Sequence, residues 1–234
     1  MAVDVDIKAL LEAGVHFGHK TSRWHPKMAQ YIHSKRQDSH IIDLTKTVEG
    51  LDKALPFLTK VAGGKQVLFV GTKKQAKDIV KAAAEKAGQP YVTERWIGGM
   101  LTNVNTISAQ IKKLKDLERR MASGDLEKRY NKLEVQRFQE EIDELNTKYG
   151  GIKNLNGKPG AIVVVDVITD ANAIKEAKTL GVPVVGVVDT NADPTPVDYV
   201  VPGNDDAIKG IQLLLDYFAA AVAEGAGSAK KEEK

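Results

Sequence analysis

Val67-Leu-Phe-Val-Gly71 is the stretch that decides the fold, because it predicts the first strand of a buried parallel sheet. A short, continuous apolar run is typical of a strand that is covered on both faces. The next segment, residues 72–87, carries small apolar side chains at helical spacing, and Gly88 and Pro90 predict the end of this helix. A buried strand followed by an amphipathic helix is the repeating unit of an α/β fold.

The same unit recurs later in the chain, around Ala161-Ile-Val-Val-Val165. A helix is predicted near residues 171–180, where Gly181 and Pro183 close it, and a last helix is predicted from Asn204 onward. Further strands are predicted at residues 91–93, 184–188 and 199–201. Strands that alternate with helices predict a parallel sheet with helices on both faces.

A long charged insertion interrupts this pattern between residues 104 and 149. Each of its halves repeats apolar residues at alternating spacings of three and four, which is the pattern of a narrow helical seam. These positions are Ile107, Ile111, Leu114, Leu117 and Met121, followed by Val135, Phe138, Ile142, Leu145 and Tyr149. Ser123 and Gly124 mark the turn between the halves. The insertion is therefore predicted to form an antiparallel coiled-coil hairpin.

The N-terminal arm, residues 16–46, is basic and contains all five histidines, which are His16, His19, His25, His33 and His40. Residues 31–33 and 40–43 are predicted to pair as a small β-hairpin, and Thr45 is predicted to cap a helix that runs to about Val61. The predicted domains are an α/β domain of residues 1–103 and 150–224, the inserted hairpin at 104–149, and a disordered tail at 225–234.

Composition limits the classes of function. The 234 residues include no cysteine, which excludes disulfides and thiolate metal sites and fits a reducing cytoplasm. No apolar run reaches the roughly 18 residues that a membrane span needs, and the acidic N-terminus does not have the order of a signal peptide. Residues 1–150 carry 26 Lys and Arg against 19 Asp and Glu, whereas residues 151–234 carry 8 against 12. This asymmetry indicates a basic face turned towards a polyanion, although ordinary solubilising charge would give the same counts.

A nucleotide-binding enzyme is one alternative, and the sequence argues against it. The first strand ends in a single glycine, in Gly71-Thr-Lys-Lys-Gln75, which matches neither the dinucleotide fingerprint nor the phosphate-binding loop of nucleotide hydrolases. Asp205 and Asp206 open the last predicted helix and would repel a phosphate there. We therefore predict no catalytic residue and no cofactor.

A cation site at the ends of the strands is a second possibility. Aspartates follow adjacent predicted strands, and histidines of the arm could fold over them; these residues are Asp189, Asp193, Asp205, Asp206, His16 and His19. Helix capping and turn formation account for the aspartates without an ion. We predict no metal, and the sequence leaves open whether His16, Asp189 and Asp205 bind a cation.

The basic arm fits RNA better than a metal, because its lysines and arginines would repel a cation but neutralise phosphates. Trp24, His25 and Tyr31 are interleaved with these cations, and planar side chains of this kind stack on bases. The loop Arg95-Trp-Ile-Gly-Gly-Met-Leu-Thr-Asn103 adds a glycine pair that allows close approach to a large partner. A solvated loop is the alternative interpretation of the arm.

Several motifs then point to one family. They are Gly14-Val-His-Phe-Gly-His19, Arg23-Trp-His-Pro-Lys-Met28, Ile41-Ile-Asp-Leu44, Leu68-Phe-Val-Gly-Thr-Lys-Lys-Gln75, the loop Arg95–Asn103, Val188-Asp-Thr-Asn191 and Pro202-Gly-Asn-Asp-Asp-Ala-Ile208. In this order they resemble the bacterial form of the second protein family of the small ribosomal subunit, over residues 5–224. His25 stands where that family usually has Asn, and Ile97 stands where it usually has Leu. Both residues are similar in size to the usual ones, so these differences bear on the geometry of contacts with a partner and not on the implied function.

The resemblance implies a flavodoxin-like parallel sheet of strand order 2-1-3-4-5 with a protruding coiled-coil hairpin. It also implies a structural protein of the small ribosomal subunit, without catalysis, that binds ribosomal RNA between head and body. Other small-subunit proteins are implied neighbours, including the large mRNA-binding protein S-one, and the acidic extension of some relatives is reduced here to a short mixed tail. No membrane and no small-molecule substrate are expected as partners.

The residues that we predict to contact RNA combine cations for phosphates with planar side chains that stack on bases or wedge the arm in place. The cations are Lys20, Arg23, Lys27, Arg36, Lys73, Lys74, Arg95, Lys112, Lys113 and Arg119. The planar side chains are Trp24, His25 and Trp96. A coiled-coil adaptor that binds only proteins is the remaining alternative, since opposite charges on the two halves of the insertion could simply pair with each other.

Overall fold

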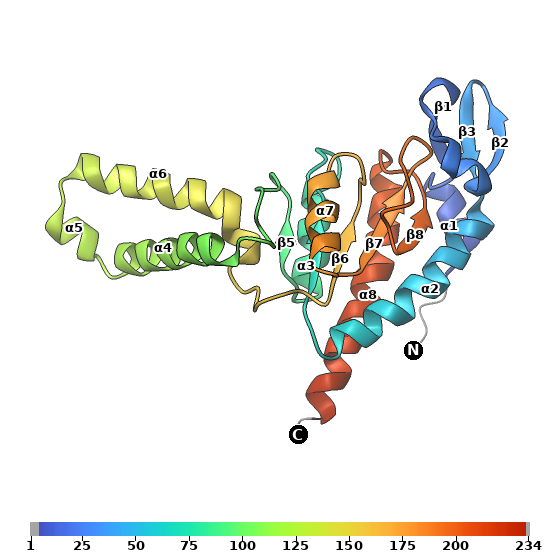
Figure 1. Ribbon diagram of the computed structural model, residues 1–234. Coiled ribbons are helices and arrows are strands. Elements are labelled where there is room, and N and C mark those ends of the chain that lie inside the picture. The colour runs from blue at the N-terminus through green and yellow to red at the C-terminus, as the bar shows by residue number, and fades with distance from the viewer. Residues whose placement is uncertain (1–4, 233–234) are drawn as a thin grey trace.

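The computed structural model describes residues 5–232 and shows an α/β body from which a helical hairpin projects (Figure 1). The main sheet contains β4 (Val67–Val70), β5 (Tyr91–Val92), β6 (Ala161–Val164), β7 (Val184–Val188) and β8 (Tyr199–Pro202). Every pairing in it is parallel, and the order is β5-β4-β6-β7-β8. Counted from its first strand along the chain, this order reads 2-1-3-4-5. The predicted α/β class is confirmed.

Two apolar cores cover the two faces of this sheet. On β4, Val67 and Phe69 face one core and Leu68 and Val70 face the other, because successive side chains of a strand point to opposite faces. The first core is covered by α2 (Leu44–Ala62), α3 (Lys77–Lys86) and α8 (Ile208–Glu232), with α1 (Ile7–Glu12) beside them. The second is covered by α7 (Ala171–Thr179) and the base of the hairpin. Burial on both faces explains the continuous apolar runs of these strands.

The hairpin consists of α4 (Val104–Ala122), a short α5 (Asp125–Arg129) at its tip, and α6 (Lys132–Tyr149). Leu114 and Leu117 of α4 and Ile142 and Leu145 of α6 are buried in the seam between the long helices. In Figure 1 the hairpin extends from the side of the sheet that ends in β5. Helix α5 was not predicted from the sequence, because its single turn is too short to produce a repeating apolar pattern.

The N-terminal arm forms a second, three-stranded antiparallel sheet at the opposite side of the molecule (Figure 1). Its strands are β1 (Phe17–Lys20), β2 (Ile32–Arg36) and β3 (Ser39–Ile42), in the order β1-β3-β2. The predicted pairing of the last two strands is found, while β1 was not predicted. The following helix is capped by Asp43 and not by Thr45, because the Asp43 side chain accepts a 2.9 Å hydrogen bond from the Thr45 amide.

The predicted disordered tail needs correction, because α8 continues through this stretch to Glu232. Residues 233–234 of the predicted tail lie outside the described part of the chain. Alanine, lysine and glutamate favour helix here, and Gly225 lets α8 approach α2 closely. A Cβ atom at Gly225 would lie 2.1 Å from the Thr59 carbonyl oxygen, so only glycine permits this crossing. Within residues 5–232, no helix combines the length and apolar character that crossing a membrane requires.

Candidate nucleic-acid interface

The arm is fixed to the main sheet through the loop that follows β7. The amide of His25 donates a 2.8 Å hydrogen bond to the Thr190 carbonyl, and the amide of His19 donates one of 2.9 Å to the Thr190 hydroxyl. Gly18 allows this contact, because a Cβ atom there would lie 2.6 Å from the Thr190 methyl group. The three-stranded sheet is therefore held at the carboxyl end of β7.

Five of the predicted RNA-contacting cations are exposed around this end of the main sheet. On the arm, Lys20 of β1 and Arg36 of β2 both pair with Ser39 of β3, so they flank the same residue from either side. Arg23 follows β1 in the short helix η1 (Thr21–Arg23). Lys74 and Arg95 follow β4 and β5. Lys74 and Arg95 lie at the carboxyl end of the main sheet, because the carboxyl ends of parallel strands share one edge. Lys20 and Arg23 line a hollow with Asp189 and Asp206 at the ends of β7 and β8, and Arg36 pairs with Ser39 of the same hollow. None of the five cations forms an ion pair with another residue in the described range 5–232.

The aromatic residues divide into two groups. Trp24 is 39% exposed, with its ring centroid 5.2 Å from that of His40, so one side of the indole remains accessible. His25 is half-buried, and its Nδ1 accepts a 3.3 Å hydrogen bond from the Lys27 amide. Trp96 is only 8% exposed, and its indole N–H donates to Glu176. Its burial favours the predicted wedging role over stacking on RNA.

Other predicted cations are already paired within the protein. Lys27 Nζ lies 3.0 Å from the Asp193 carboxylate and 2.7 Å from the Thr195 hydroxyl. On the hairpin, Lys113 pairs with Glu141, and Arg119 pairs with Asp116. Lys112 is exposed and has no such partner in the described part of the hairpin. The hairpin therefore offers fewer free cations than its composition indicates.

Lys73 is a correction to the predicted interface. Its ammonium nitrogen lies 2.6 Å from Asp205, 2.7 Å from Asp206 and 3.5 Å from Asp166, and its side chain is 16% exposed. Burial alone would lower the pKa of Lys73, but its hydrogen bonds to Asp205 and Asp206 outweigh this effect and raise the pKa above its usual range. Lys73 thus neutralises carboxylates inside the protein, and most of its side chain is covered.

We call the residues around Lys73 the strand-end crevice, and they are Asp166, Asp189, Asp205, Asp206 and His19. His19 bridges two of the carboxylates, with Nδ1 3.0 Å from Asp189 and Nε2 3.3 Å from Asp206. Burial and the charge of Asp189 raise the pKa of Asp205 to about 7 in spite of Lys73. Potential ligand atoms of His19, Asp205 and Asp206 lie within 4.8 Å of one another. The Lys73 ammonium already supplies positive charge at this point, and we assign no metal to the crevice.

The other candidate cation ligands lie apart from this cluster. Asp193 is held by Lys27, which belongs to the arm. His16 packs its ring against Phe17, with 4.0 Å between the centroids, and its Nδ1 is buried without a hydrogen-bond partner among the described residues. Burial lowers the pKa of His16 and so favours its neutral form. The structure therefore does not bring His16 into the crevice with Asp189 and Asp205.

His19 should make the stability of the protein depend on pH. Its hydrogen bond to Asp189 raises its pKa above 6.5, against the opposing effect of burial. When folding raises the pKa of a histidine, its protonation stabilises the fold. This stabilisation is complete below the unfolded-state pKa and is lost as the pH rises through the folded-state pKa. We expect the free energy of unfolding to fall by about 0.5 kcal/mol above pH 7, a small effect because the pair is partly exposed. Urea unfolding of wild type and His19→Gln between pH 6 and 9 measures this loss.

The control for this prediction is His33→Gln, which changes an exposed histidine of β2. Folding also raises the pKa of Asp205, to about 7, so protonation of Asp205 stabilises the fold as well. Most of this stabilisation is already lost when the pH reaches that pKa. An equal loss of stability above pH 7 in wild type and His19→Gln would contradict the role of His19.

The loop 95–103 contains a contact that the sequence did not predict. The carboxylate of Glu176, on α7, accepts hydrogen bonds from the Trp96 indole and from the amides of Gly99, Leu101 and Thr102. It also accepts one from the Thr102 hydroxyl. Gly99 adopts a φ of +87°, which a residue with a side chain rarely does, so the glycine has a backbone role. No local sequence signal links Glu176 to a loop about 75 residues earlier.

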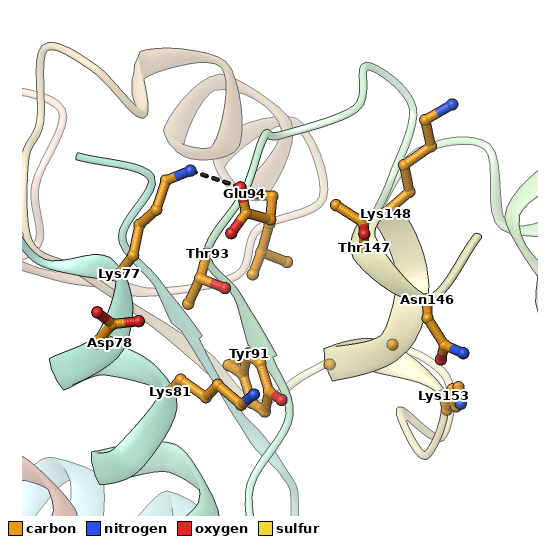
Figure 2. A pocket seen from close by; sticks show the side chains of 13 residues that line it. Lys77, Asp78, Lys81, Tyr91, Thr93, Glu94, Asn146, Thr147, Lys148 and Lys153 are labelled. Carbon is orange, nitrogen blue, oxygen red and sulfur yellow. Dashed lines mark hydrogen bonds and ion pairs between the residues drawn. The ribbon is translucent and has the colours of Figure 1, made fainter. Parts of the chain in front are cut away.

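A polar pocket of about 490 Å³ lies between α3, β5 and the C-terminal end of α6. Figure 2 shows Lys77 turned towards Glu94, and the two are 2.5 Å apart. Two further lysines of this pocket, Lys148 and Lys153, pair with glutamates of the hairpin. The lining contains no histidine, and Lys77 and Glu94 are the lining residues that pair with each other in the described range. We assign no catalytic role to this pocket.

The comparison with protein families agrees with this architecture. The family model described as ribosomal protein S2 matches residues 10–225. The match includes the arm, every strand of the main sheet and the whole hairpin. On the basis of a match that covers nearly the entire chain, the protein belongs to the ribosomal protein S2 family.

Proposed function

We propose that the chain is a structural constituent of the small ribosomal subunit that binds ribosomal RNA and helps to anchor a neighbouring ribosomal protein. Family membership supports the structural role. The observation that carries RNA binding is a set of exposed cations that form no ion pair with any residue from 5 to 232, which are Lys20, Arg23, Arg36, Lys74 and Arg95. A cation that pairs with a carboxylate of the protein has its charge balanced internally, whereas an unpaired cation can neutralise a phosphate.

The mechanism that we infer is charge neutralisation combined with a rigid mount. The two apolar cores hold the sheet, and the contacts to Thr190 hold the arm on it. Trp24 is placed to stack on a base or lie along the ribose-phosphate chain beside these cations. Residues 104–149 act as a separate projecting unit whose Lys112 would reach a different part of the RNA. In this role the protein functions in the cytoplasm, within the small ribosomal subunit.

Anchoring of a neighbour such as the protein S-one is also part of the proposal. Large apolar side chains of the first seventeen residues are about half exposed, namely Ile7, Leu11 and Phe17. Side chains of this kind suit contact with another protein more than contact with phosphates. Helix α1 and the start of the arm would thus meet protein, while the cations of the arm meet RNA.

Salt dependence tests the RNA-binding part of the proposal. If about six phosphates are contacted, the logarithm of the association constant should fall with the logarithm of the salt concentration at a slope of about −4 to −5. Filter binding or fluorescence anisotropy with small-subunit ribosomal RNA between low and physiological salt measures this slope. An affinity that does not change with salt would overturn RNA binding through phosphates.

The competing enzyme interpretation makes a different prediction. A nucleotide or a divalent cation that binds the strand-end crevice would raise the melting temperature by mass action. We expect no substantial shift, because Lys73 and His19 already occupy the carboxylates. A thermal-shift assay with ATP, GTP and Mg²⁺ distinguishes the two.

A further inference from the structure

Glu176 is saturated with hydrogen-bond donors from a single loop. Its Oε1 lies 3.0 Å from the Trp96 indole nitrogen and 2.7 Å from the Gly99 amide nitrogen. Its Oε2 lies 3.0 Å from the Leu101 amide nitrogen, and 3.2 and 3.1 Å from the amide nitrogen and hydroxyl of Thr102. A carboxylate offers about four lone-pair positions, so these donors use all of its accepting capacity. We call this arrangement the Glu176 contact.

The Glu176 contact lies at the point where the body meets the hairpin. Thr102, which it binds through two groups, is followed directly by Asn103, whose side chain accepts from the Thr106 amide and caps α4. The first residue of α4 is Val104. Only Asn103 therefore separates the Glu176 contact from the first turn of α4.

The returning chain has its own attachment to the body. After α6, Gly151 packs against β5 so closely that a Cβ atom there would lie 2.2 Å from the Tyr91 carbonyl oxygen. Lys153 and Asn146 both bind Glu118, at 2.6 and 2.8 Å, and so join the C-terminal part of α4 to the end of α6 and the segment after it. The hairpin thus has two attachments, and the Glu176 contact is the one on the α4 side.

We propose that Glu176 is the positioning residue that fixes the direction of the hairpin relative to the sheet. One rigid helix of the body holds the loop by charge-assisted hydrogen bonds, which are stronger than neutral ones. Without the carboxylate, the donors of Trp96, Gly99 and Leu101 lose their acceptor, and the loop can take other conformations. Small changes at the base move the tip furthest, because α4 extends for 19 residues from this point. This inference concerns the free protein and does not depend on RNA binding.

The charge of Glu176 is maintained at neutral pH. Burial raises its pKa, but the hydrogen bonds from Trp96, Gly99, Leu101 and Thr102 together outweigh burial and hold the pKa below its usual range. The ionised carboxylate therefore accepts hydrogen bonds on both oxygens, from Trp96 and Gly99 on Oε1 and from Leu101 and Thr102 on Oε2. A glutamine at this position would turn an amide NH₂ towards one group of donors and leave that group unsatisfied.

The natural absence of cysteine makes a direct test possible. Two cysteines, Ala122→Cys at the end of α4 and Lys60→Cys on α2, are exposed and can be spin-labelled as a unique pair. Double electron–electron resonance then measures the distance between hairpin and body. With the native residue we expect one narrow distance distribution. With Glu176→Gln we expect a distribution about twice as wide, and about tenfold faster hydrogen exchange at the amides of Gly99, Leu101 and Thr102.

The matched control is Lys175→Gln, which changes the exposed neighbour of Glu176 on the same helix. Thr102→Val, which removes one of the donors to Glu176, should give an intermediate distribution. Melting temperatures of all variants separate a change of direction from general unfolding. A folded Glu176→Gln protein with an unchanged distance distribution would overturn the proposal, whatever its affinity for RNA.

Discussion

Reversal of three arm charges, Lys20→Glu, Arg23→Glu and Arg36→Glu, is expected to reduce the affinity for small-subunit ribosomal RNA by more than about 100-fold. Each of these side chains is exposed and free of internal ion pairs with the described residues, so each change removes a phosphate contact and adds repulsion. The slope of affinity against salt should also become shallower by about 2 to 3 units, roughly one for each lost contact. Binding measured at several salt concentrations gives both quantities.

A control with the same change of net charge separates local contact from general repulsion. Lys60, Lys65 and Lys86 are exposed and lie near the C-terminal ends of α2 and α3 or just before β4. This is the amino end of the sheet, opposite the proposed interface. Their replacement by glutamate should weaken binding far less than the arm variant. Equal losses in the two triple variants would show that net charge alone governs binding, and the assigned interface would then be wrong.

Incorporation into ribosomal particles provides a second readout for the same variants. Tagged protein from a cell lysate is separated on a sucrose gradient, and its share in the small-subunit fraction is measured. The arm variant should move towards the free-protein fractions, while the control variant should remain with the particles. An adaptor that binds only proteins through the hairpin predicts instead that the arm variant stays bound.

The sequence predicted those parts of the fold that depend on short-range patterns. Continuous apolar runs identified the strands at 67–71 and 161–165, because burial on both faces leaves no polar position. The regular apolar spacing identified the long helices α4 and α6. Strand β1 was missed because none of its side chains is fully buried, so it has no apolar pattern. Its partner strand, β3, lies about 20 residues later in the sequence.

The candidate site was less predictable, because ion pairs bring together residues that are distant in sequence. Lys73 looked like an exposed cation beside Lys74, yet it is bound to Asp205, which lies 132 residues later. Glu176 carried no signal at all, since its donors lie 74 to 80 residues earlier. Charge counts identify how many cations a chain has, while the fold decides which of them remain free. The loop 95–103 was recognised as important, but for contact with a partner and not for contact with α7.

Replacement of Lys73 by methionine is expected to destabilise the protein by about 3 kcal/mol, because it leaves the carboxylates of the strand-end crevice without their central cation. Asp205 is 3% exposed in its side chain and Asp166 is 7% exposed, so water cannot take the place of the ammonium. The free energy of unfolding from urea titration at pH 8 measures the loss. Such a loss would make the role of Lys73 structural, in contrast to the phosphate contact expected from the sequence.

The adjacent lysine provides the matched control, since Lys74 is exposed and forms no ion pair within the described chain. Lys74→Met should change stability by less than about 0.5 kcal/mol. Without Lys73, the pKa of Asp205 should rise further above its present value of about 7, because burial and Asp189 then act unopposed. A group with a raised pKa destabilises the fold as the pH rises, so the Lys73→Met protein should recover part of its stability between pH 8 and pH 6. If Lys73→Met were as stable as Lys74→Met at pH 8, the crevice would not depend on the ammonium, and Lys73 would again be available to bind RNA.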